Sequence, residues 1–398
     1  MLTLQRLTLT DFRNYEHLVW RRSARISVLS GPNGSGKTNL LEAVSLLVPG
    51  RGLRGARLAE VPRLGTSDWA VAARLAHGTE PFEVGTGTTP EAPAGRRVFR
   101  LDGAPVRNRA AIAEQLCAVW LTPQMDRLFI EGPSGRRRFL DRLVLALEPD
   151  HARQVASHDE ALQGRNRLLQ GTPDPAWLAA VEHSLARHAV AVAAARRSLV
   201  GRMNMLAQAQ DDRAGSGGAG FPPALLALDC EVAERLGREP ALAVEDWLRA
   251  TLRERRQDDA GVPGRTSLGA PSLGAHRADL RLSDLRSGRP ASLGSTGQQK
   301  ALLIGTVLSH AALIASSRGE APLLLLDEPL VHLDASHRSA LFTALLELPA
   351  PVLLTGTDPE PFAPLAGRAE ILRVAVGKLG PEEGFPVLEA GSAGAGAV

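Results

Sequence analysis

Apolar positions near the beginning of the chain change from the spacing of a strand to the spacing of a helix. Residues 26–30, Ile-Ser-Val-Leu-Ser, form a short run that is typical of a β-strand. From Lys37 to Val48 the apolar residues fall on one helical face: Leu40, Leu41, Val44, Leu47 and Val48. A glycine-rich segment separates the two runs. This pattern predicts a strand, a tight loop and a helix.

A purely apolar run lies near the other end of the chain. Leu323–Leu326 is four consecutive leucines, which is typical of a strand buried on both faces in a parallel sheet. The helical pattern from Ala301 to Ala315 precedes it. Together with the strand near the beginning, this run predicts an α/β domain whose two halves come from opposite ends of the chain.

The middle of the chain is mostly helical in pattern. Arg136 to Gln170 and Pro175 to Gln210 have long helical spacings, which predict an antiparallel helical hairpin. The apolar positions of the second helix are Trp177, Val181, Leu185, Val190 and Leu199. A strand from Leu225 to Val232 and a helix from Leu242 to Arg256 are expected to follow. We expect these faces to form the core of a separate lobe.

Glycine, proline and serine clusters mark the boundaries. The segments 214–220 and 258–274 are expected to be loops, and the turns near Gly85 to Arg96 predict a β-hairpin edge. We therefore expect a head split in sequence between residues 1–125 and 276–390. A mostly helical lobe, residues 126–275, is inserted between the halves. Residues 391–398 are expected to be a disordered tail.

Composition says more about the cellular compartment of the protein than about any reaction that it catalyses. The two cysteines, Cys117 and Cys230, are too few for a disulfide framework, and no apolar signal region follows the first methionine. These features favour a reducing cytosol, and no uninterrupted apolar stretch predicts a membrane span. The net charge of +3 and pI of about 9.3 permit a polyanionic partner. Ten scattered histidines give no ligand spacing for a metal other than Mg²⁺.

The loop after the first strand carries a phosphate-binding pattern. Residues 31–38, Gly-Pro-Asn-Gly-Ser-Gly-Lys-Thr, match the motif in which backbone N–H groups surround phosphate oxygens. Lys37 is expected to reach the β- and γ-phosphates of ATP, and Thr38 to bind Mg²⁺. Only three of the 46 basic residues are lysine, so a specific need for a compact ammonium explains Lys37. The expected nucleotide contacts here are Gly31, Asn33, Gly34, Gly36, Lys37, Thr38 and Asn39.

Two acidic residues follow the four-leucine strand. Asp327 is expected in the Mg²⁺ shell, and Glu328 stands where a carboxylate would activate the attacking water. With Lys37, these are the candidate catalytic residues. The pair of motifs predicts an ATPase.

A third motif indicates the subclass. Residues 295–300, Ser-Thr-Gly-Gln-Gln-Lys, begin a predicted helix before the acidic strand, in the order of an ABC-type ATPase signature. In such heads the signature closes on ATP bound to a second copy, so Ser295, Gly297 and Gln298 are expected to complete a site across a dimer. Asp334 is expected to cross the same interface. Gln124 stands in the place of the glutamine that joins head to lobe and contacts Mg²⁺.

Together these segments resemble the RecF family of bacterial recombination-mediator ATPases. The resemblance runs from residue 1 to about residue 375 and rests on Leu4-x-x-Leu7-x-Leu9-x-x-Phe12-Arg13-Asn14-Tyr15, the loop at 31–39, Gly132-Pro133 with Arg136 to Asp141, Gly274 to Leu280, the signature, and Thr355 to Asp358. It implies a cytosolic ATPase that dimerises with ATP and binds double-stranded DNA. It further implies work with RecR and RecO to direct RecA loading at gap junctions.

The chain departs from related patterns at three places. Thr296 replaces a glycine of the transporter signature, and no histidine stands between Thr355 and Asp358, where transporters carry a switch histidine. Either Thr355 or Thr357 could supply a hydroxyl instead. Ala278 replaces an aspartate of the RecF pattern.

Some alternatives stay open from the sequence. Arg136, Arg137 and Arg138 fit either a solvated helix start or a DNA-contacting patch. Tyr15 fits either a place beside adenine or packing under the first strand. The alternative function is an ABC-type ATPase subunit that drives a protein partner or a transporter. The inserted lobe is far too short for the long coiled coil of an SMC protein.

Overall fold

The computed structural model describes residues 1–89, 96–171, 174–214, 220–260 and 273–386. Its chain divides into two units. We call Met1–Arg127, Ala214–Pro222 and Ser295–Val398 the head unit, and Leu128–Arg213 with Pro223–Gly294 the lobe unit. The tail expected at 391–398 and most of the loop expected at 258–274 lie outside the described residues.

The head unit is built from both ends of the chain, as the motifs predicted, but two segments differ from the expected division. Ala214 and residues 220–222 were expected in the lobe and lie in the head unit. Residues 276–294 were expected in the head and lie in the lobe unit. The reason is a strand pair: β10, Asp279–Asp284, forms an antiparallel ladder with β9, Ala224–Asp229. Strand β9 begins as expected but ends before Cys230, because Glu231–Arg235 forms the short helix α6.

One sheet of the head contains the predicted strands. Its order is β14-β13-β3-β12-β11-β8, and every pair is parallel except β14 with β13. Strand β3 has the predicted bounds Ile26–Ser30, and β11 the predicted bounds Leu323–Leu326; all their residues are buried. The other strands are β8 (Ala118–Leu121), β12 (Val352–Gly356), β13 (Ala369–Ala375) and β14 (Lys378–Pro381). The sheet is mixed, as expected.

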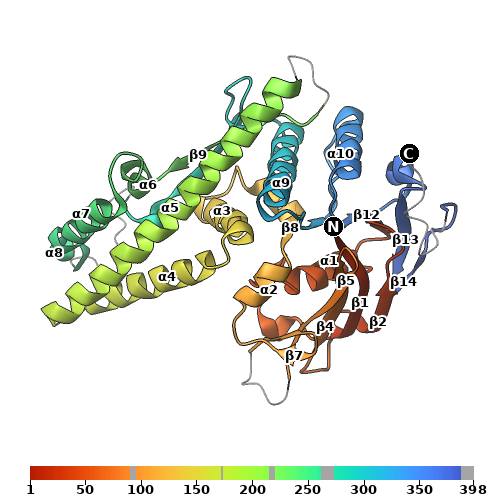
Figure 1. Cartoon of the computed structure of the whole chain (residues 1–398), viewed down its shortest axis with the longest axis horizontal. Helices are drawn as coiled ribbons and strands as arrows, with labels where there is room; N and C mark the ends of the chain where they lie inside the picture. The colour runs from red at the N-terminus through yellow and green to blue at the C-terminus, as the bar shows by residue number, and fades with distance from the viewer. Residues whose placement is uncertain (90–95, 172–173, 215–219, 261–272, 387–398) are drawn as a thin grey trace. The chain divides into compact units, whose positions relative to one another are not determined.

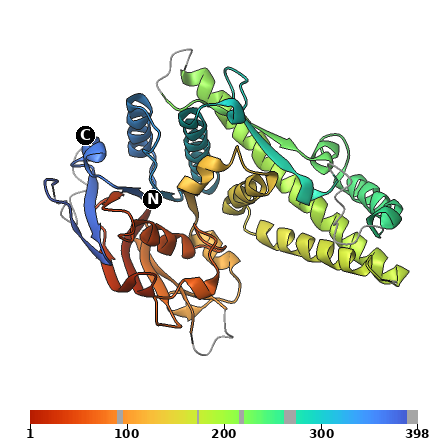
Figure 2. The same cartoon turned by 180° about the vertical axis from the view of Figure 1, so that it is seen from behind.

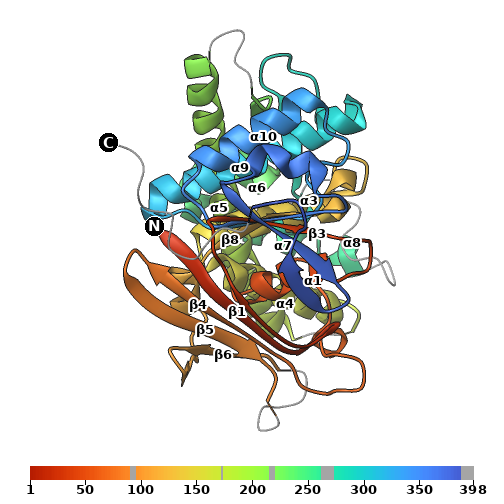
Figure 3. The ribbon, with the colours of Figure 1, turned by 90° about the vertical axis from the view of Figure 1, so that its right-hand side faces the viewer.

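The second sheet of the head is antiparallel, in the order β2-β1-β4-β5-β6-β7 (Figure 3). Its strands are β1 (Leu2–Phe12), β2 (Tyr15–Arg21), β4 (Ala70–His77), β5 (Glu80–Gly87), β6 (Val98–Leu101) and β7 (Ala104–Pro105). The expected hairpin is the β5–β6 pair, and Gly85 lies within β5 instead of in a turn. Helix α1, Lys37–Leu46, contacts strands of both sheets, so its predicted apolar face is buried between them.

The remaining head helices are α2 (Ala110–Gln115), α9 (Thr296–Arg318) and α10 (Ala335–Glu347), with short 3₁₀ turns η1 (Leu58–Glu60), η2 (Pro123–Arg127) and η6 (Glu360–Leu365). Helix α9 is the one described helix long and apolar enough to cross a membrane by length and composition. Within the structure, 61% of its apolar window is buried. Lys300 in this helix is 1% exposed and ion-paired with Asp126 at 2.9 Å. These are features of a core helix.

The lobe unit is mostly helical, as expected. Its elements are α3 (Pro133–Leu147), α4 (His151–Leu168), α5 (Pro175–Ala214), α6, α7 (Ala241–Glu254) and α8 (Arg256–Ala260), together with β9, β10 and the short turns η4 (Ala275–Arg277) and η5 (Ala291–Leu293). Helices α4 and α5 run side by side in Figures 1 and 2. The Gln154–His188 and Arg165–Glu182 hydrogen bonds show that they are antiparallel.

Two details of the lobe differ from the pattern. The helical spacing from Arg136 to Gln170 is divided between α3 and α4, because Pro149 cannot donate a backbone hydrogen bond and disfavours helical geometry in Glu148, whose φ is −125° and ψ 88°. Trp177, expected on the apolar face of α5, is 63% exposed. It lies in the first turn of α5, at the end of the helix.

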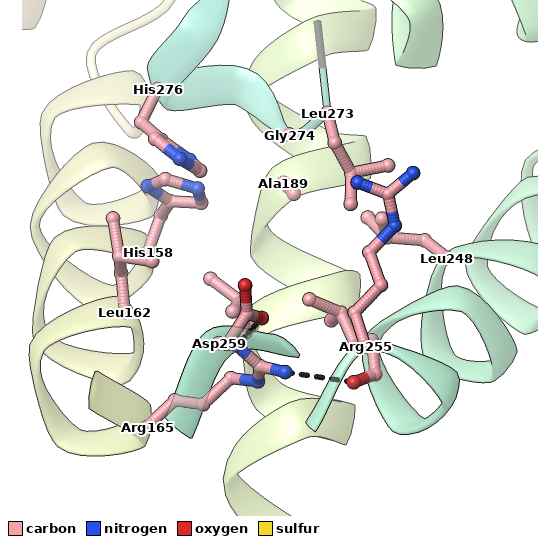
Figure 4. Close-up of a pocket in the computed structure, with 12 residues that line it drawn as sticks. His158, Leu162, Arg165, Ala189, Leu248, Arg255, Asp259, Leu273, Gly274 and His276 are labelled. Carbon is pink, nitrogen blue, oxygen red and sulfur yellow. Dashed lines mark hydrogen bonds and ion pairs between the residues drawn. The ribbon is translucent and has the colours of Figure 1, made fainter. Parts of the chain in front are cut away.

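A buried arginine of α4 joins this helix to three others of the lobe, α5, α7 and α8. Arg165 is 0% exposed; its guanidinium donates to Glu182 at 3.1 Å, Asp259 at 2.7 Å and the carbonyl of Leu252 at 2.7 Å. Figure 4 shows Arg165 and Asp259 at one end of a cavity of about 20 Å³, with His158 and His276 at the other. Such a volume is close to that of one water molecule.

We predict that Arg165→Ala lowers the free energy of unfolding by about 3 kcal/mol, because it leaves buried carboxylates with fewer partners. Urea denaturation followed by circular dichroism measures this change. Arg167→Ala, an exposed residue of the same helix, is the control and should change stability by less than about 0.5 kcal/mol. Equal transitions in the two variants would contradict the bridging role of Arg165.

Candidate nucleotide site

The phosphate-loop sequence lies between the carboxyl end of β3 and the start of α1, as predicted. Two of its glycines are required by geometry. Gly31 has φ +144°, and a Cβ there would lie 2.4 Å from the carbonyl oxygen of Val374. Gly36 has φ +116°, and a Cβ there would lie 2.5 Å from Asn14 Nδ2. No other residue type fits these positions without moving backbone or neighbours. Asn33 and Gly34 lie at the exposed tip of the loop.

Asn14 and Tyr15 hold the loop from outside. The Tyr15 hydroxyl donates to the carbonyl of Gly36 at 3.1 Å, and Asn14 Nδ2 donates to the carbonyl of Ser35 at 3.1 Å. Asn39, which was expected to contact nucleotide, donates to Asn14 Oδ1 at 2.7 Å. Tyr15 is fully buried, and burial raises the pKa of its hydroxyl. Of the two interpretations of Tyr15, packing agrees with this position.

The Lys37 side chain lies within the phosphate loop, as expected. Its Nζ donates to the carbonyls of Gly31 at 2.6 Å and Pro32 at 3.0 Å. Burial lowers the pKa of Lys37, while the nearby charges of Glu328 and Asp327 act in the opposite direction. The ammonium is therefore held at the loop by weak neutral acceptors, which a phosphate oxygen can replace.

The two halves of the head meet at Asp327. Thr38 Oγ1, from the first half, donates to Asp327 Oδ1 at 2.9 Å. Thr355 Oγ1, from the second half, donates to the same oxygen at 2.7 Å. Asp327 is 4% exposed, so its carboxylate is oriented by both hydroxyls in a nearly closed environment. The Thr38 hydroxyl and the Asp327 carboxylate, 2.9 Å apart, supply oxygen atoms, which are the ligands that Mg²⁺ prefers.

Glu328 follows in a rare backbone conformation. Its φ is +48°, in the left-handed region that residues with a side chain seldom adopt. Its backbone N–H donates to Thr355 Oγ1 at 2.8 Å, which helps to hold this turn. The turn ends the strand abruptly, and the Glu328 side chain is half-buried beside the loop. Strain of this kind is concentrated at functional sites.

The structure distinguishes the two threonines considered as substitutes for a switch histidine. Thr355 is 0% exposed and engaged with Asp327 and Glu328. Thr357 is exposed; its carbonyl accepts a hydrogen bond from the Gly31 N–H at 3.2 Å, so it adjoins the loop. Thr355 is therefore placed to position acids, and Thr357 is the one with an accessible hydroxyl.

The signature forms the start of α9. Ser295 caps the helix: its Oγ accepts from the Gln298 N–H at 3.3 Å, and its own N–H donates to Gln298 Oε1 at 2.9 Å. Gly297 allows close approach, since a Cβ there would lie 2.9 Å from the carbonyl oxygen of His332. Thr296 begins the helix. The signature and the segment before α10 are thus in contact within one chain.

Asp334 is exposed and caps α10. It accepts from the His337 N–H at 2.8 Å and from Ser336 Oγ at 2.7 Å, and these bonds hold the pKa of its carboxyl well below the usual range. Gln124 lies exposed in η2, which follows β8. Since β8 pairs with β11, Gln124 follows the strand beside Asp327. The structure gives no bond between Gln124 and the Thr38–Asp327 pair among the described residues.

The arginine cluster of the lobe is largely used inside its own unit. Arg136 makes two bonds to the Asp279 carboxylate, at 2.7 and 3.0 Å, and Arg137 donates to the carbonyl of Ala278 at 3.0 Å. Only Arg138 of the three is exposed. Ala278 itself is 0% exposed, so an aspartate there would need a buried partner.

Comparison with known proteins agrees with this geometry. The model of the RecF/RecN/SMC N terminal domain matches residues 3–351. The chain is 45% identical over 383 residues to the DNA replication and repair protein RecF of Mesorhizobium japonicum, covering 96% of this chain and 98% of that protein. It is 43% identical to the protein of the same name from Agrobacterium fabrum, with 94% and 98% covered. The chain belongs to the RecF family.

Solved structures share the fold of this RecF family member. One described as the recombination mediator protein RecF-ATP in the RecFOR pathway has a TM-score of 0.76 at 19% identity, covering 96% of this chain and 99% of the other. An Smc head bound to the C-winged helix domain of ScpA has a TM-score of 0.52 at 14% identity, with 94% and 95% covered. The expected ABC-like head with an inserted helical region is confirmed.

Sequence reasoning missed two supporting contacts. One is the hydroxyl of Thr355 between Asp327 and Glu328, which the motif alone could not locate. The other is the buried Lys300–Asp126 ion pair, which ties the signature helix to the turn that carries Gln124. The scarcity of lysine was a usable signal for the second contact.

We predict that Thr355→Val lowers ATP hydrolysis at least about tenfold, because it removes one donor from Asp327 and leaves the Glu328 N–H without its acceptor, a loss of about 1–3 kcal/mol. Steady-state phosphate release measures this effect. Thr355→Ser keeps the hydroxyl and should retain most of the activity. A serine variant as impaired as the valine variant would show that the hydroxyl alone does not account for the role of Thr355, and a fully active valine variant would contradict that role.

Proposed function

We propose that this RecF family member is an ATP-dependent DNA-binding protein that dimerises around ATP. The observation that carries the proposal is the Thr38–Asp327 contact at 2.9 Å, which brings the expected phosphate loop and the expected Mg²⁺ ligand together from two distant parts of the chain. Full-length similarity to proteins named for DNA replication and repair supports the biological assignment.

ATP binding is assigned to the loop from Gly31 to Asn39. Its backbone N–H groups would surround phosphate oxygens, and Lys37 would exchange its two carbonyl acceptors for charged ones. Thr38 and Asp327 would hold Mg²⁺, with Gln124 as a further donor from the neighbouring turn. When bound, the metal would neutralise phosphate charge during transfer.

Hydrolysis is assigned to Glu328 as the base that accepts a proton from water. Asp327 and Lys37 would orient the phosphates. Because the Glu328 N–H donates to Thr355 Oγ1, the turn that carries this carboxylate would already be held before nucleotide binds. We expect slow turnover that serves as a switch between monomer and dimer.

Dimerisation is assigned to the signature and to Asp334. Ser295, Gly297 and Gln298 would contact the γ-phosphate held by a second copy, using the N-terminus of α9 as an anion site. Because Gly297 lies against the carbonyl of His332, binding of the γ-phosphate at the signature would also affect the position of Asp334. The exposure of Ser295 and Asp334 fits residues that meet a partner.

The partner molecules proposed are duplex DNA, RecR and RecO. Binding of double-stranded DNA at gap junctions by the ATP-bound dimer would promote RecA loading in recombinational repair and replication restart, in the cytoplasm. Family membership supports this role, and the related protein described in the RecFOR pathway is consistent with it. Arg138 is the exposed member of the Arg136–Arg138 cluster and so its strongest DNA candidate.

We predict that Glu328→Gln binds ATP and accumulates as a dimer while hydrolysing about 100-fold more slowly, because the amide keeps shape but loses basicity. Phosphate release and sedimentation with ATP measure the two effects. Glu360→Gln removes an exposed carboxylate elsewhere in the head and is the charge control. Unchanged turnover in Glu328→Gln would assign the base to another residue.

We predict that Ser295→Arg blocks ATP-dependent dimerisation but leaves ATP affinity of the monomer unchanged, because the added cation occupies the place of the partner's phosphate. Ser295→Ala serves as the milder control, since it removes only the helix cap, worth about 1 kcal/mol. Nucleotide binding by fluorescence and dimerisation by sedimentation separate the effects. Loss of ATP affinity in the monomeric arginine variant would show that Ser295 acts on its own nucleotide.

A further inference from the structure

A second arginine-rich site lies in the head unit, beside the later turns of α1. It is a cavity of about 270 Å³ whose lining includes Arg51, Arg57, Arg96, Arg97 and Arg109. The phosphate loop precedes the first residue of α1, whereas this cavity is lined by Glu42 and the loop that follows the helix. A volume near 270 Å³ approaches that of ordinary ligand pockets. We call it the arginine pocket.

The charges of the arginine pocket are unbalanced. Its one acidic lining residue is Glu42, which already accepts from Arg13 at 2.6 and 2.9 Å and from Arg54 at 3.4 Å. Within the described part of the chain, no ion pair engages any of the five arginines. Positive charge gathered around a concave surface whose one acid is already bonded to other arginines is an arrangement that attracts an anion.

Arg97 is the buried element of the pocket. It is 6% exposed, and its Nη2 donates to the carbonyls of Gly50 at 2.9 Å and Val48 at 3.4 Å. Its guanidinium lies 4.5 Å from the ring centre of Phe99, and that of Arg109 lies 5.8 Å from the same ring. Burial, aided by the charge of Arg109, lowers the pKa of Arg97 to about 10. Two guanidiniums on one ring repel each other, and a bound anion would relieve this.

Phosphate is the anion that matches this chemistry. Planar guanidiniums donate paired hydrogen bonds to phosphate oxygens, and they carry charge at every physiological pH. The Arg136 and Arg137 side chains, by contrast, already bond to Asp279 and Ala278. The arginine pocket therefore offers more uncommitted guanidiniums for phosphate than the cluster at the start of α3.

We propose that the arginine pocket binds a phosphate group of the backbone of duplex DNA. This inference rests on the proposed function, because it places one of the DNA contacts of that function in the head. Contacts to backbone phosphates fix the position of a protein on DNA without reading sequence. The pocket would thus anchor the duplex, and would do so equally on any sequence.

The test compares two double variants in the presence of a non-hydrolysed ATP analogue. Arg51→Gln with Arg109→Gln removes two exposed guanidiniums of the pocket; Arg21→Gln with Arg368→Gln removes two exposed charges elsewhere on the head. Duplex affinity is measured as a function of salt. For the pocket variant we expect weaker binding on all sequences and a log-log salt slope that is shallower by about 0.9 for each phosphate that the protein no longer neutralises. The control variant should keep the wild-type slope.

A second arm identifies the source of the phosphate. Pyrophosphate binding is measured by calorimetry with the nucleotide site saturated by ATP analogue. Pyrophosphate that binds wild type but not the pocket variant, with duplex affinity unchanged, would overturn DNA as the ligand and assign a free phosphate. Wild type that binds duplex while both double variants behave alike would overturn the arginine pocket alone. Wild type that fails to bind duplex would overturn the proposed function, and with it DNA as the source.

Discussion

The candidate nucleotide site depends on one shared carboxylate. Asp327 accepts from Thr38, 289 residues earlier, and from Thr355, 28 residues later. Strand order makes this possible, because β12 lies between β3 and β11 and so brings the ends of all three strands to one edge. The two hydroxyls stabilise this buried carboxylate, since an unpaired charge there would be costly. The candidate site is therefore complete only when residues from both halves of the head are in place.

Part of the head could be predicted from sequence, because two of its central strands are buried along their whole length and its loop needs glycine at two positions. The bounds of β3 and β11 follow directly from apolar runs, and Gly31 and Gly36 from the motif. The lobe was harder. One proline divided a continuous helical spacing into α3 and α4, and β10 joined the lobe because it pairs with β9. Periodicity reports which face is buried, not which neighbour buries it.

Arginine usage also limited what the sequence could show. The sequence does not distinguish an exposed arginine from one that bonds to groups inside the protein. Several arginines of this chain are of the second kind. Arg25 donates to the carbonyls of Leu345 and Ala350, at 3.0 and 3.2 Å, and so satisfies the end of α10. Arg136 and Arg165 act similarly in the lobe. A forked guanidinium can bond several acceptors at once, which an ammonium on a flexible stem does less well.

The place of β3 has a consequence for synthesis on the ribosome. Both edges of this buried strand are covered by strands that are made more than 300 residues later, β12 and β13. At 5–20 residues per second, the 289 residues between Thr38 and Asp327 take on the order of 15–60 s to translate. Throughout that time the nascent head exposes an apolar strand with two unpaired edges, which is a template for aggregation. Cellular yield of this protein should therefore depend on chaperones that shield the emerging N-terminal half.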